Sequence, residues 1–271
     1  MSEGEKFRAI VLAGERPGGS VLARALELPA GILAPLADQP CITRVVDALC
    51  SARRVDGLTL VGPARQIVDA NEALRDLLER PGLKWLPPQP GPAASALHAA
   101  RDTGHYPLLL TSGDHGLLTA AIVDGFCERA WAARDSGADF LVGLVPYPLV
   151  QEAFPESRRT ILRFADQALC GSNLFALLTP AAQQALAFWQ QVEADRKRPW
   201  KIARRLGAAT LARYLAGRLS TDDAFAVLSQ RAGCRIDWLP VDSARAAVDV
   251  DSEADWRLAD AVLRGQGPDG S

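Results

Sequence analysis

The sequence predicts an α/β fold built around a mostly parallel sheet, and three observations support this prediction. Short apolar strands alternate with amphipathic helices over the first half of the chain. The first strand, FRAIVL, runs directly into a loop that contains glycines. The 271 residues, of which 48% are hydrophobic, can bury a substantial core. Such alternation implies right-handed crossovers and places ligands at the carboxyl ends of the parallel strands.

The elements of the first half follow from the spacing of apolar residues. After the strand at 7–12, the segment 41–54 has Ile42, Val45 and Leu49 at helical spacing, so a helix follows the first loop. The same reasoning predicts strands at 57–61, 83–86, 106–111 and 140–145, and helices at 65–78, 93–101 and 117–134. The proline-rich segment 87–92 is predicted to be a stiff loop at the functional site.

The pattern changes after Pro146, where the strands become shorter and helices dominate. The elements expected there are strands at 160–164, 173–178, 235–239 and 247–250, mainly helix from residue 180, and a closing helix at 253–263. No internal repeat or flexible linker interrupts the chain. We therefore predict a single domain over residues 1–271, with a helical, basic insertion at about 180–234.

Composition excludes several classes of protein. The net charge of −2 is too small for bulk nucleic-acid binding, which requires a strongly basic surface. The five cysteines form no C-x-x-C pair, so neither a zinc site nor a disulfide framework is predicted. No apolar run approaches the roughly 18 residues of a membrane span, and the polar start MSEGEK lacks the apolar core of a signal peptide. We expect a cytoplasmic protein with no nucleic-acid partner.

The loop after the first strand has the composition of a phosphate-binding site. Ala13 and Gly14 lack the bulk that would keep the backbone away from a ligand. Gly18 and Gly19 allow positive φ angles. Unpaired backbone N–H groups and the guanidinium of Arg16 would then face the end of the strand, and a triphosphate suits that field. A tight strand-to-helix turn is the alternative interpretation of the same residues.

A second candidate site lies where the strand at 106–111 ends in the residues SGDH. Because parallel strands end at the same edge of a sheet, Asp114 is expected close to Arg16. A carboxylate beside a triphosphate is favoured when a divalent cation lies between them, since like charges at ~4 Å repel. The alternative is that Asp114 caps the N-terminus of the following helix.

A third, acidic group, VDVDSEAD, spans residues 248–255. Asp249 and Asp251 would share one face of the strand expected there, because side chains of a strand alternate with a period of two. Asp251, at the end of that strand, is the better placed of the two to bind a magnesium ion together with Asp114. Capping of the closing helix by Asp251 or Ser252 is the alternative explanation.

Two more segments are candidates for nucleoside and acceptor contacts. The sequence GPAAS, from Gly91 to Ser95, opens a helix whose N-terminus offers backbone groups to a ribose hydroxyl or a base. Asn173 carries an amide that suits an acceptor or a ribose. The alternatives are that Ser95 is an ordinary helix cap and that Asn173 is an ordinary turn residue.

The segment 196–218 contains eight Lys and Arg residues, Arg198 among them, and no acidic residue. Its leucines and isoleucine can form an apolar side, so it has the pattern of a basic amphipathic helix. Three interpretations remain open: peripheral contact with a membrane surface, a clamp for an anionic acceptor, or a solvated face. In the second interpretation Arg198 is the residue that we expect to contact the acceptor.

Taken in order, these motifs resemble those of the MobA-like nucleotidyltransferases. The matching segments are VLAGERPGG, PLADQP, GPAAS, SGDH, GSNLF and VDVDSEAD, which together extend from Phe7 to Leu263. The resemblance implies a GT-A-like, nucleotide-diphospho-sugar transferase-like fold, that is, a three-layer α/β/α sandwich. It also implies that the first loop holds a triphosphate and that an Asp after the central strand binds Mg²⁺.

The resemblance assigns roles to individual residues of this chain. Nucleotide contacts fall to Leu12, Ala13, Gly14, Arg16 and Ser95, and Gly91 joins them as the start of the Ser95 helix. Metal contacts fall to Asp114 and Asp251, catalytic roles to Arg16 and Asp114, and an acceptor contact to Asn173. The implied function is a magnesium-dependent nucleotidyltransferase that moves an NMP from an NTP to a phosphate- or hydroxyl-bearing acceptor and releases pyrophosphate.

The chain departs from the family pattern at positions that carry charge. Glu15 stands where the family loop has a small residue, and Asp38 stands where PLADQP would have Gly. A Lys usually precedes that motif, but here Ala30 and Gly31 occupy the place. Losing one preorganised charge partner costs on the order of 3 kcal/mol at a transition state. The second hypothesis is therefore a catalytically degenerate nucleotide-binding regulatory or scaffold protein.

Overall fold

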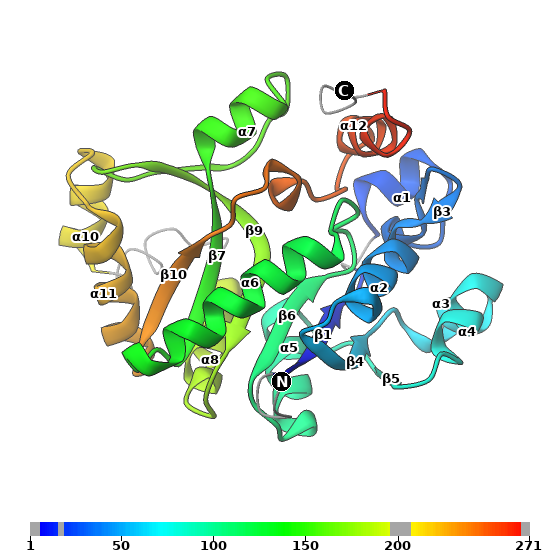
Figure 1. The fold of residues 1–271 in the computed structure, drawn as a ribbon, viewed down its shortest axis with the longest axis horizontal. Coiled ribbons are helices and arrows are strands. Elements are labelled where there is room, and N and C mark those ends of the chain that lie inside the picture. Colours follow the sequence, from blue (N-terminus) through cyan, green and yellow to red (C-terminus); the bar gives the residue numbers. More distant parts are fainter. Residues whose placement is uncertain (1–5, 16–18, 196–206, 267–271) are drawn as a thin grey trace.

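The protein, described from a computed structural model, is organised around an eight-stranded mixed sheet (Figure 1). The structure describes residues 6–15, 19–195 and 207–266. The strand order is β10-β7-β9-β6-β1-β4-β5, with β8 paired to β9. The strands are β1 Phe7–Leu12, β4 Val55–Val61, β5 Leu83–Leu86, β6 Leu108–Ser112, β7 Phe140–Pro146, β8 Ile161–Arg163, β9 Ala168–Leu177 and β10 Ile236–Pro240.

The sheet is mostly parallel, as predicted. β1 runs parallel to β4 and β6, β4 to β5, and β7 to β10, whereas β9 is antiparallel to β6, β7 and β8. Leu12, the last residue of β1, lies opposite Val61 of β4 and Ser112 of β6. The carboxyl ends of these three strands therefore meet at one edge, where the loops that follow them are brought together.

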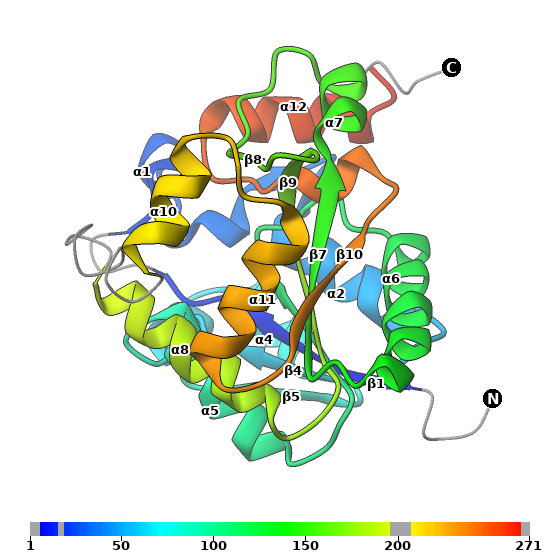
Figure 2. The same cartoon turned by 90° about the vertical axis from the view of Figure 1, so that its left-hand side faces the viewer.

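Helices cover both faces of the sheet, which makes the predicted three layers (Figure 2). Ala9 and Val11 of β1 pack into one core cluster, with residues of α2 and α6. Ile10 points to the opposite face and packs with residues of α5 and α8. The main helices are α2 Cys41–Ser51, α4 Glu72–Leu78, α5 Pro92–Thr103, α6 Ala120–Ala133, α8 Ala182–Ala194 and α11 Thr221–Ala232.

A third, smaller core lies beyond the carboxyl edge of the sheet. It is formed by α1 Val21–Ala25, the hairpin of β2 Pro35–Leu36 and β3 Gln39–Pro40, and the closing helix α12 Glu253–Leu263. Trp256 Nε1 donates a hydrogen bond to the carbonyl oxygen of Pro35 at 2.6 Å. The amide of Ala37 donates to Asp260 Oδ1 at 2.7 Å. The C-terminal helix is thereby attached to the segment that follows the first loop.

Several predicted elements differ from the structure. The helix predicted at 65–78 is divided into α3 Arg65–Asp69 and α4, because Asn71 between them caps α4 by accepting a hydrogen bond from Leu74 N at 3.1 Å. The strand predicted at 247–250 is wrong: the short helix η4 Ala244–Ala247 covers its start, and the following residues pair with no strand of the described part of the chain. The strand predicted at 173–178 is the middle and end of the ten-residue β9.

Further helices were not predicted, namely α1, the short η2 Gly31–Leu33, and α7 Tyr147–Ala153 after β7. Within the segment predicted as a helical insertion, the structure shows α8, α10 Ala208–Leu215 and α11. Residues 196–206 of that segment lie outside the described residues, so the insertion and the single domain remain predictions. None of the described helices is both long and apolar enough to cross a bilayer.

Candidate functional site

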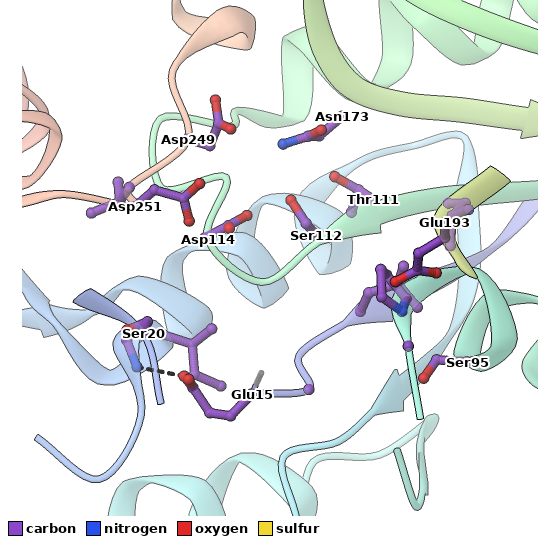
Figure 3. Close-up of a pocket in the computed structure, with 18 of the residues that line it drawn as sticks. Glu15, Ser20, Ser95, Thr111, Ser112, Asp114, Asn173, Glu193, Asp249 and Asp251 are labelled. Atoms are coloured by element: carbon purple, nitrogen blue, oxygen red, sulfur yellow. Dashed lines mark hydrogen bonds between the residues drawn. The ribbon is translucent and has the colours of Figure 1, made fainter. Parts of the chain in front are cut away.

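A cavity of about 600 Å³ lies at the carboxyl edge of the sheet (Figure 3). It is bordered by the end of β1, the end of β6, the loop before α5, the middle of β9 and the extended segment before α12. The polar residues that line it include Glu15, Ser20, Gln89, Ser95, Thr111, Ser112, Asp114, Asn173, Glu193, Asp249 and Asp251. The topology therefore brings the separately predicted sites to one place.

Asp114 lies in a tight turn directly after β6. Gly113 N donates to the carbonyl oxygen of Leu12 at 2.8 Å, so this turn is tied to the end of β1. Asp114 does not cap a helix, because α6 begins six residues later and its N-cap is Thr119, which accepts a hydrogen bond from Ile122 N. The helix-cap explanation of Asp114 is therefore wrong.

Asp251 reaches the same cavity without being part of a strand. The amide of Val250 donates to the carbonyl oxygen of Asp114 at 2.9 Å, which holds the two segments together. The cap of α12 is Ser252, which forms a capping box with Asp255. Asp251 is thus free of a capping role, and in Figure 3 its carboxylate points toward Asp114.

The acidic residues form an unusual electrostatic environment. The pKa of Asp114 is raised to about 7, first by burial and then by the nearby charges of Asp251 and Asp249. Burial also raises the pKa of Asp249, while the guanidinium of Arg159 opposes that shift. The buried Oδ1 of Asp114 has no hydrogen-bond partner among the described residues. A buried, unpartnered carboxylate oxygen beside other carboxylates is a donor set that suits a hard divalent cation.

The described residues alone supply an incomplete coordination shell for a metal ion. Among the described residues, no three His, Cys, Asp or Glu side chains are close enough together to hold a metal ion. Mg²⁺ usually takes one or two carboxylates and completes its octahedron with waters and substrate phosphates. Asp114 and Asp251 therefore fit a Mg²⁺ ion that arrives with a phosphorylated ligand, rather than one held by a protein cage.

The first loop, which follows β1, borders the same cavity as these carboxylates. Leu12 and Gly14 line the cavity, whereas Ala13 is buried behind them and does not line it. A Cβ on Gly14 would lie 3.3 Å from the Cβ of Pro88, so the loop and the segment before α5 are in close contact. Arg16, predicted to contact the nucleotide, lies outside the described residues.

The end of this loop is held by an unexpected contact. Glu15 Oε1 accepts a hydrogen bond from the amide of Gly31 at 2.6 Å, and both residues line the cavity. A Cβ on Gly31 would lie 2.5 Å from Ser20 Oγ, so the side chain of Ser20, which caps α1, fills the space that a side chain at Gly31 would need. The other residue that departs from the family pattern, Asp38, lies apart from the cavity and forms an exposed ion pair with Arg264.

The N-terminus of α5 faces the cavity, as predicted for GPAAS. Gly91 is its N-cap and provides no side chain, so a carboxylate from α8 takes that role: Glu193 Oε2 accepts from Ala93 N at 3.2 Å. Ser95 lies inside the helix and is not its cap. Its hydroxyl accepts a hydrogen bond from Gln89 N at 3.0 Å, which holds the preceding loop against the helix.

Asn173 lines the cavity from β9 and has a left-handed φ of 51°. Phe175, two residues later, lines it too and packs on Trp189 of α8, with ring centroids 6.0 Å apart. Asn173 therefore lies within the cavity and in a strand, so the alternative that it is an ordinary turn residue is wrong. Arg198, the other predicted acceptor residue, lies outside the described residues.

Sequence reasoning did not identify Trp189, Glu193 or Arg159 as parts of this site. Trp189 and Glu193 are four residues apart, so they lie on one face of α8. That spacing was visible in the sequence, but nothing local showed that α8 packs against the start of α5. Arg159, whose side chain is 9% exposed, contacts Asp249 and Asp255 from the loop before β8.

Comparison with known proteins gives a consistent result. The family model of the MobA-like NTP transferase domain matches residues 9–234 of this chain. A solved structure of a hypothetical transferase from Thermus thermophilus is similar, with 27% sequence identity and a TM-score of 0.74 over 93% of this chain and 99% of that chain. No curated protein matches the sequence.

Two other solved structures share the fold at low sequence identity. A CMP:2-keto-3-deoxy-manno-octonic acid synthetase complexed with CTP is 12% identical, with a TM-score of 0.59 over 96% of this chain and 98% of that chain. A 2-C-methyl-D-erythritol 4-phosphate cytidylyltransferase, also from Thermus thermophilus, is 14% identical, with a TM-score of 0.55 over 96% of this chain and 99% of that chain. These similarities establish the architecture of the sheet and its helices.

Proposed function

Because the chain belongs to the family of MobA-like NTP transferase domains, we propose that it is a magnesium-dependent nucleotidyltransferase. The observation that carries the proposal is the meeting of Asp114 and Asp251 in one cavity with the loop after β1. A carboxylate pair beside backbone amides suits a metal-bound triphosphate. The reaction moves an NMP from an NTP to an acceptor, and pyrophosphate leaves.

The chemistry needs positioning and neutralisation of charge rather than a nucleophilic side chain. An oxygen of the acceptor attacks the α-phosphorus, and the bond from that phosphorus to the oxygen bridging to the β-phosphate breaks. A bound Mg²⁺ would neutralise charge on the phosphates. Asp114 and Asp251 would hold it, and backbone groups from Leu12 to Gly14 would lie along the triphosphate.

The remaining cavity residues divide between nucleoside and acceptor. The loop from Gln89 to Gly91, with Ser95 behind it, lies beside the first loop and suits the nucleoside. Asn173 presents an amide that can donate to or accept from an acceptor phosphate or hydroxyl. Arg16 and Arg198 retain their proposed contacts with the triphosphate and with the anionic acceptor. We expect these substrates, and no nucleic acid, to be the partners, in the cytoplasm.

Transfer of a labelled nucleotide tests this function. The full-length protein would be incubated with each α-labelled NTP, Mg²⁺ and a deproteinised metabolite extract, and both pyrophosphate and NMP-bearing products would be measured. We expect magnesium-dependent release with at least one NTP, lost in Asp114→Asn. The control is Asp56→Asn, which removes the same charge from an exposed position on β4. Equal turnover in the Asp114 variant and in the control would refute the role of Asp114.

One observation favours a second candidate, a nucleotide-binding regulator or scaffold without turnover. No described residue supplies a cation to the cavity wall at Gly31, and the amide of Gly31 already donates to the carboxylate of Glu15. A nucleotide would stabilise such a protein by on the order of 2.7 kcal/mol at a hundredfold excess over Kd, which raises the melting temperature. The regulator would release no pyrophosphate with any acceptor fraction. The enzyme would show both the increase in melting temperature and the release of pyrophosphate.

A further inference from the structure

We infer that Glu193 recognises the base of the bound nucleotide and that it selects guanine. This inference rests on the proposed function, because it needs an NTP in the cavity with its phosphates near Asp114. It goes further by naming the nucleotide and the side chain that recognises its base. Three features support it: the position of Glu193 in the cavity, the unused acceptor sites of its carboxylate and the aromatic ring beside it.

The position of Glu193 is opposite the acidic end of the cavity. In Figure 3, Asp114, Asp249 and Asp251 lie on one side, and Glu193 and Ser95 lie on the other. A triphosphate that shares a cation with Asp114 and Asp251 has its γ- and β-phosphates at the first side. The nucleoside then extends toward the second side, where Glu193 lines the cavity beside Gln89 and Gly91.

The Glu193 carboxylate is held by a hydrogen bond to α5 and has further acceptor sites that this bond does not use. Its Oε2 accepts a hydrogen bond from Ala93 N at 3.2 Å, at the N-terminus of the twelve-residue α5. The helix dipole favours a negative charge there. Oε1 accepts no hydrogen bond from any described residue, although it lies against Gly91, where an added Cβ would be 2.7 Å away. A carboxylate has about four lone-pair sites and only accepts, so it can receive two donors from a ligand.

Trp189 supplies a flat surface next to this carboxylate. It lies one helical turn before Glu193 on the same face of α8 and also lines the cavity. Its ring packs on Phe175, which fixes its orientation. Stacking of a base on an aromatic ring is worth roughly 1–3 kcal/mol and tolerates every base with only modest preferences. Stacking therefore explains binding of a nucleobase, and the carboxylate must supply the choice among bases.

Hydrogen-bond complementarity makes that choice. Guanine presents two adjacent donors on its pairing edge, N1–H and the 2-amino group, and a carboxylate can accept from both. Adenine and cytosine place a ring nitrogen acceptor beside their amino group, and uracil places its single N–H between two carbonyl oxygens. Each of these would bring a lone pair toward a negative charge. A site that hydrogen-bonds a ligand group strongly rejects analogues that lack it.

Binding measurements on a graded series of nucleotides test the inference on the full-length protein. Titration calorimetry with Mg²⁺ would compare GTP, ITP, XTP, ATP, CTP and UTP. ITP lacks the 2-amino group, and XTP has a carbonyl oxygen in its place. The variant Glu193→Gln keeps an oxygen that can accept from Ala93 N and gains an amide donor that pairs with the xanthine carbonyl. Glu79→Gln, an exposed position at the end of α4, is the matched control.

We expect the wild type to bind GTP more tightly than ITP by at least about tenfold, with XTP weaker still. Glu193→Gln should weaken GTP by about tenfold and strengthen XTP, whereas Glu79→Gln should change neither. A residue that only caps α5 would not produce tighter XTP binding. Preference for another base, or an unchanged order in Glu193→Gln, would overturn this inference and leave the proposed function standing. Absence of binding by every NTP would instead refute the proposed function.

Discussion

The amide of Val250 donates a hydrogen bond to the carbonyl oxygen of Asp114 at 2.9 Å. This bond joins the turn after β6 to the segment before α12, two segments that lie far apart in the sequence. Because Asp249 and Asp251 flank Val250, the bond brings both their carboxylates to the neighbourhood of Asp114. A backbone hydrogen bond therefore holds the three carboxylates at the acidic end of the cavity close together. Their mutual repulsion destabilises the fold, and the packing of the rest of the chain compensates for it.

Replacement of Asp114 should stabilise the metal-free protein at high pH. The pKa of Asp114 is raised from 3.8 to about 7, so the folded state holds a proton over that range that the unfolded state does not. Its contribution to stability is full below pH 3.8 and is lost as the pH rises through 7. Asp114→Asn removes this loss.

Urea titrations without Mg²⁺ would measure this effect. Asp114→Asn should exceed the wild type in unfolding free energy at pH 8 by more than at pH 5, with on the order of 4 kcal/mol as an upper limit. The exposed Asp56→Asn serves as the control. A difference that does not depend on pH would contradict the assignment of a largely neutral Asp114 near pH 6.

His115, the neighbour of Asp114, should have the opposite effect on stability. It is fully buried, its Nδ1 lies 3.3 Å from Thr111 Oγ1, and burial lowers its pKa from 6.5 to about 4. The folded state therefore excludes a proton that the unfolded state binds, and stability present above pH 6.5 is lost as the pH falls to 4. The loss is about 3 kcal/mol at most.

The Asp114→Asn background isolates this behaviour, because it removes the opposing carboxyl group. In that background, unfolding free energies should fall from pH 6.5 to pH 4, and the fall should be smaller after His115→Gln is added. Parallel pH profiles with and without His115 would show that another group causes the acid sensitivity.

Arg159 should determine how well the acidic segment binds a cation. Its Nη1 lies 3.3 Å from the carbonyl oxygen and 3.4 Å from Oδ1 of Asp249, and its other terminal nitrogen pairs with Asp255. Arg159→Met leaves both carboxylates without this partner, so we expect a loss of about 2 kcal/mol in stability. In this variant, the Mg²⁺ concentration that gives half-maximal nucleotide binding should rise by a larger factor than the nucleotide Kd measured at saturating Mg²⁺.

The control for Arg159 is Arg257→Met on α12, which removes an exposed i,i+4 ion pair with Glu253. Surface pairs of this kind contribute about 0.3–0.5 kcal/mol. Calorimetric titrations at several Mg²⁺ concentrations would separate the two variants. If both behave alike, Arg159 has no special role in positioning Asp249 and Asp251.

Gly62 should be essential for the shape of the first loop. It has a φ of +87°, and an added Cβ would lie 2.9 Å from Cα and N of Gly14. Gly82 has a similar φ of +78°, but nothing lies within 4 Å of the corresponding Cβ position. Gly82→Ala should cost about 1 kcal/mol from backbone strain alone. Gly62→Ala should cost more and should also weaken nucleotide binding, measured by thermal unfolding and calorimetry. Equal effects on binding would show that the loop does not contact the nucleotide.

The sequence predicted the elements with a strong period most accurately. The strands β1 and β6 are largely apolar, and chain order alone places their ends at one edge of a parallel sheet. The sequence alone therefore places Asp114 near the first loop. The strand predicted around Asp249 was wrong, because alternating apolar and acidic residues also suit an extended segment that lies outside the sheet.

The division of the helix at 65–78 has a local signal, because Asn is a preferred N-cap residue and Asn71 caps α4. Several parts of the cavity carry no such signal. Glu193 is an ordinary polar residue on an amphipathic helix until α8 packs on α5. The hydrogen bond from Gly31 to Glu15 likewise requires a particular path of the loop, which neither residue type reveals.

The sequence by itself determined the layered α/β architecture and the place of Asp114 at the end of a central strand. It did so because side-chain periodicity and the direction of parallel strands are local properties that chain order carries into space. Only the tertiary structure decided which side chains face Asp114 across the cavity. Those contacts, from Asp251 at one end to Glu193 at the other, arise from packing between elements remote in sequence, and no local pattern encodes that packing.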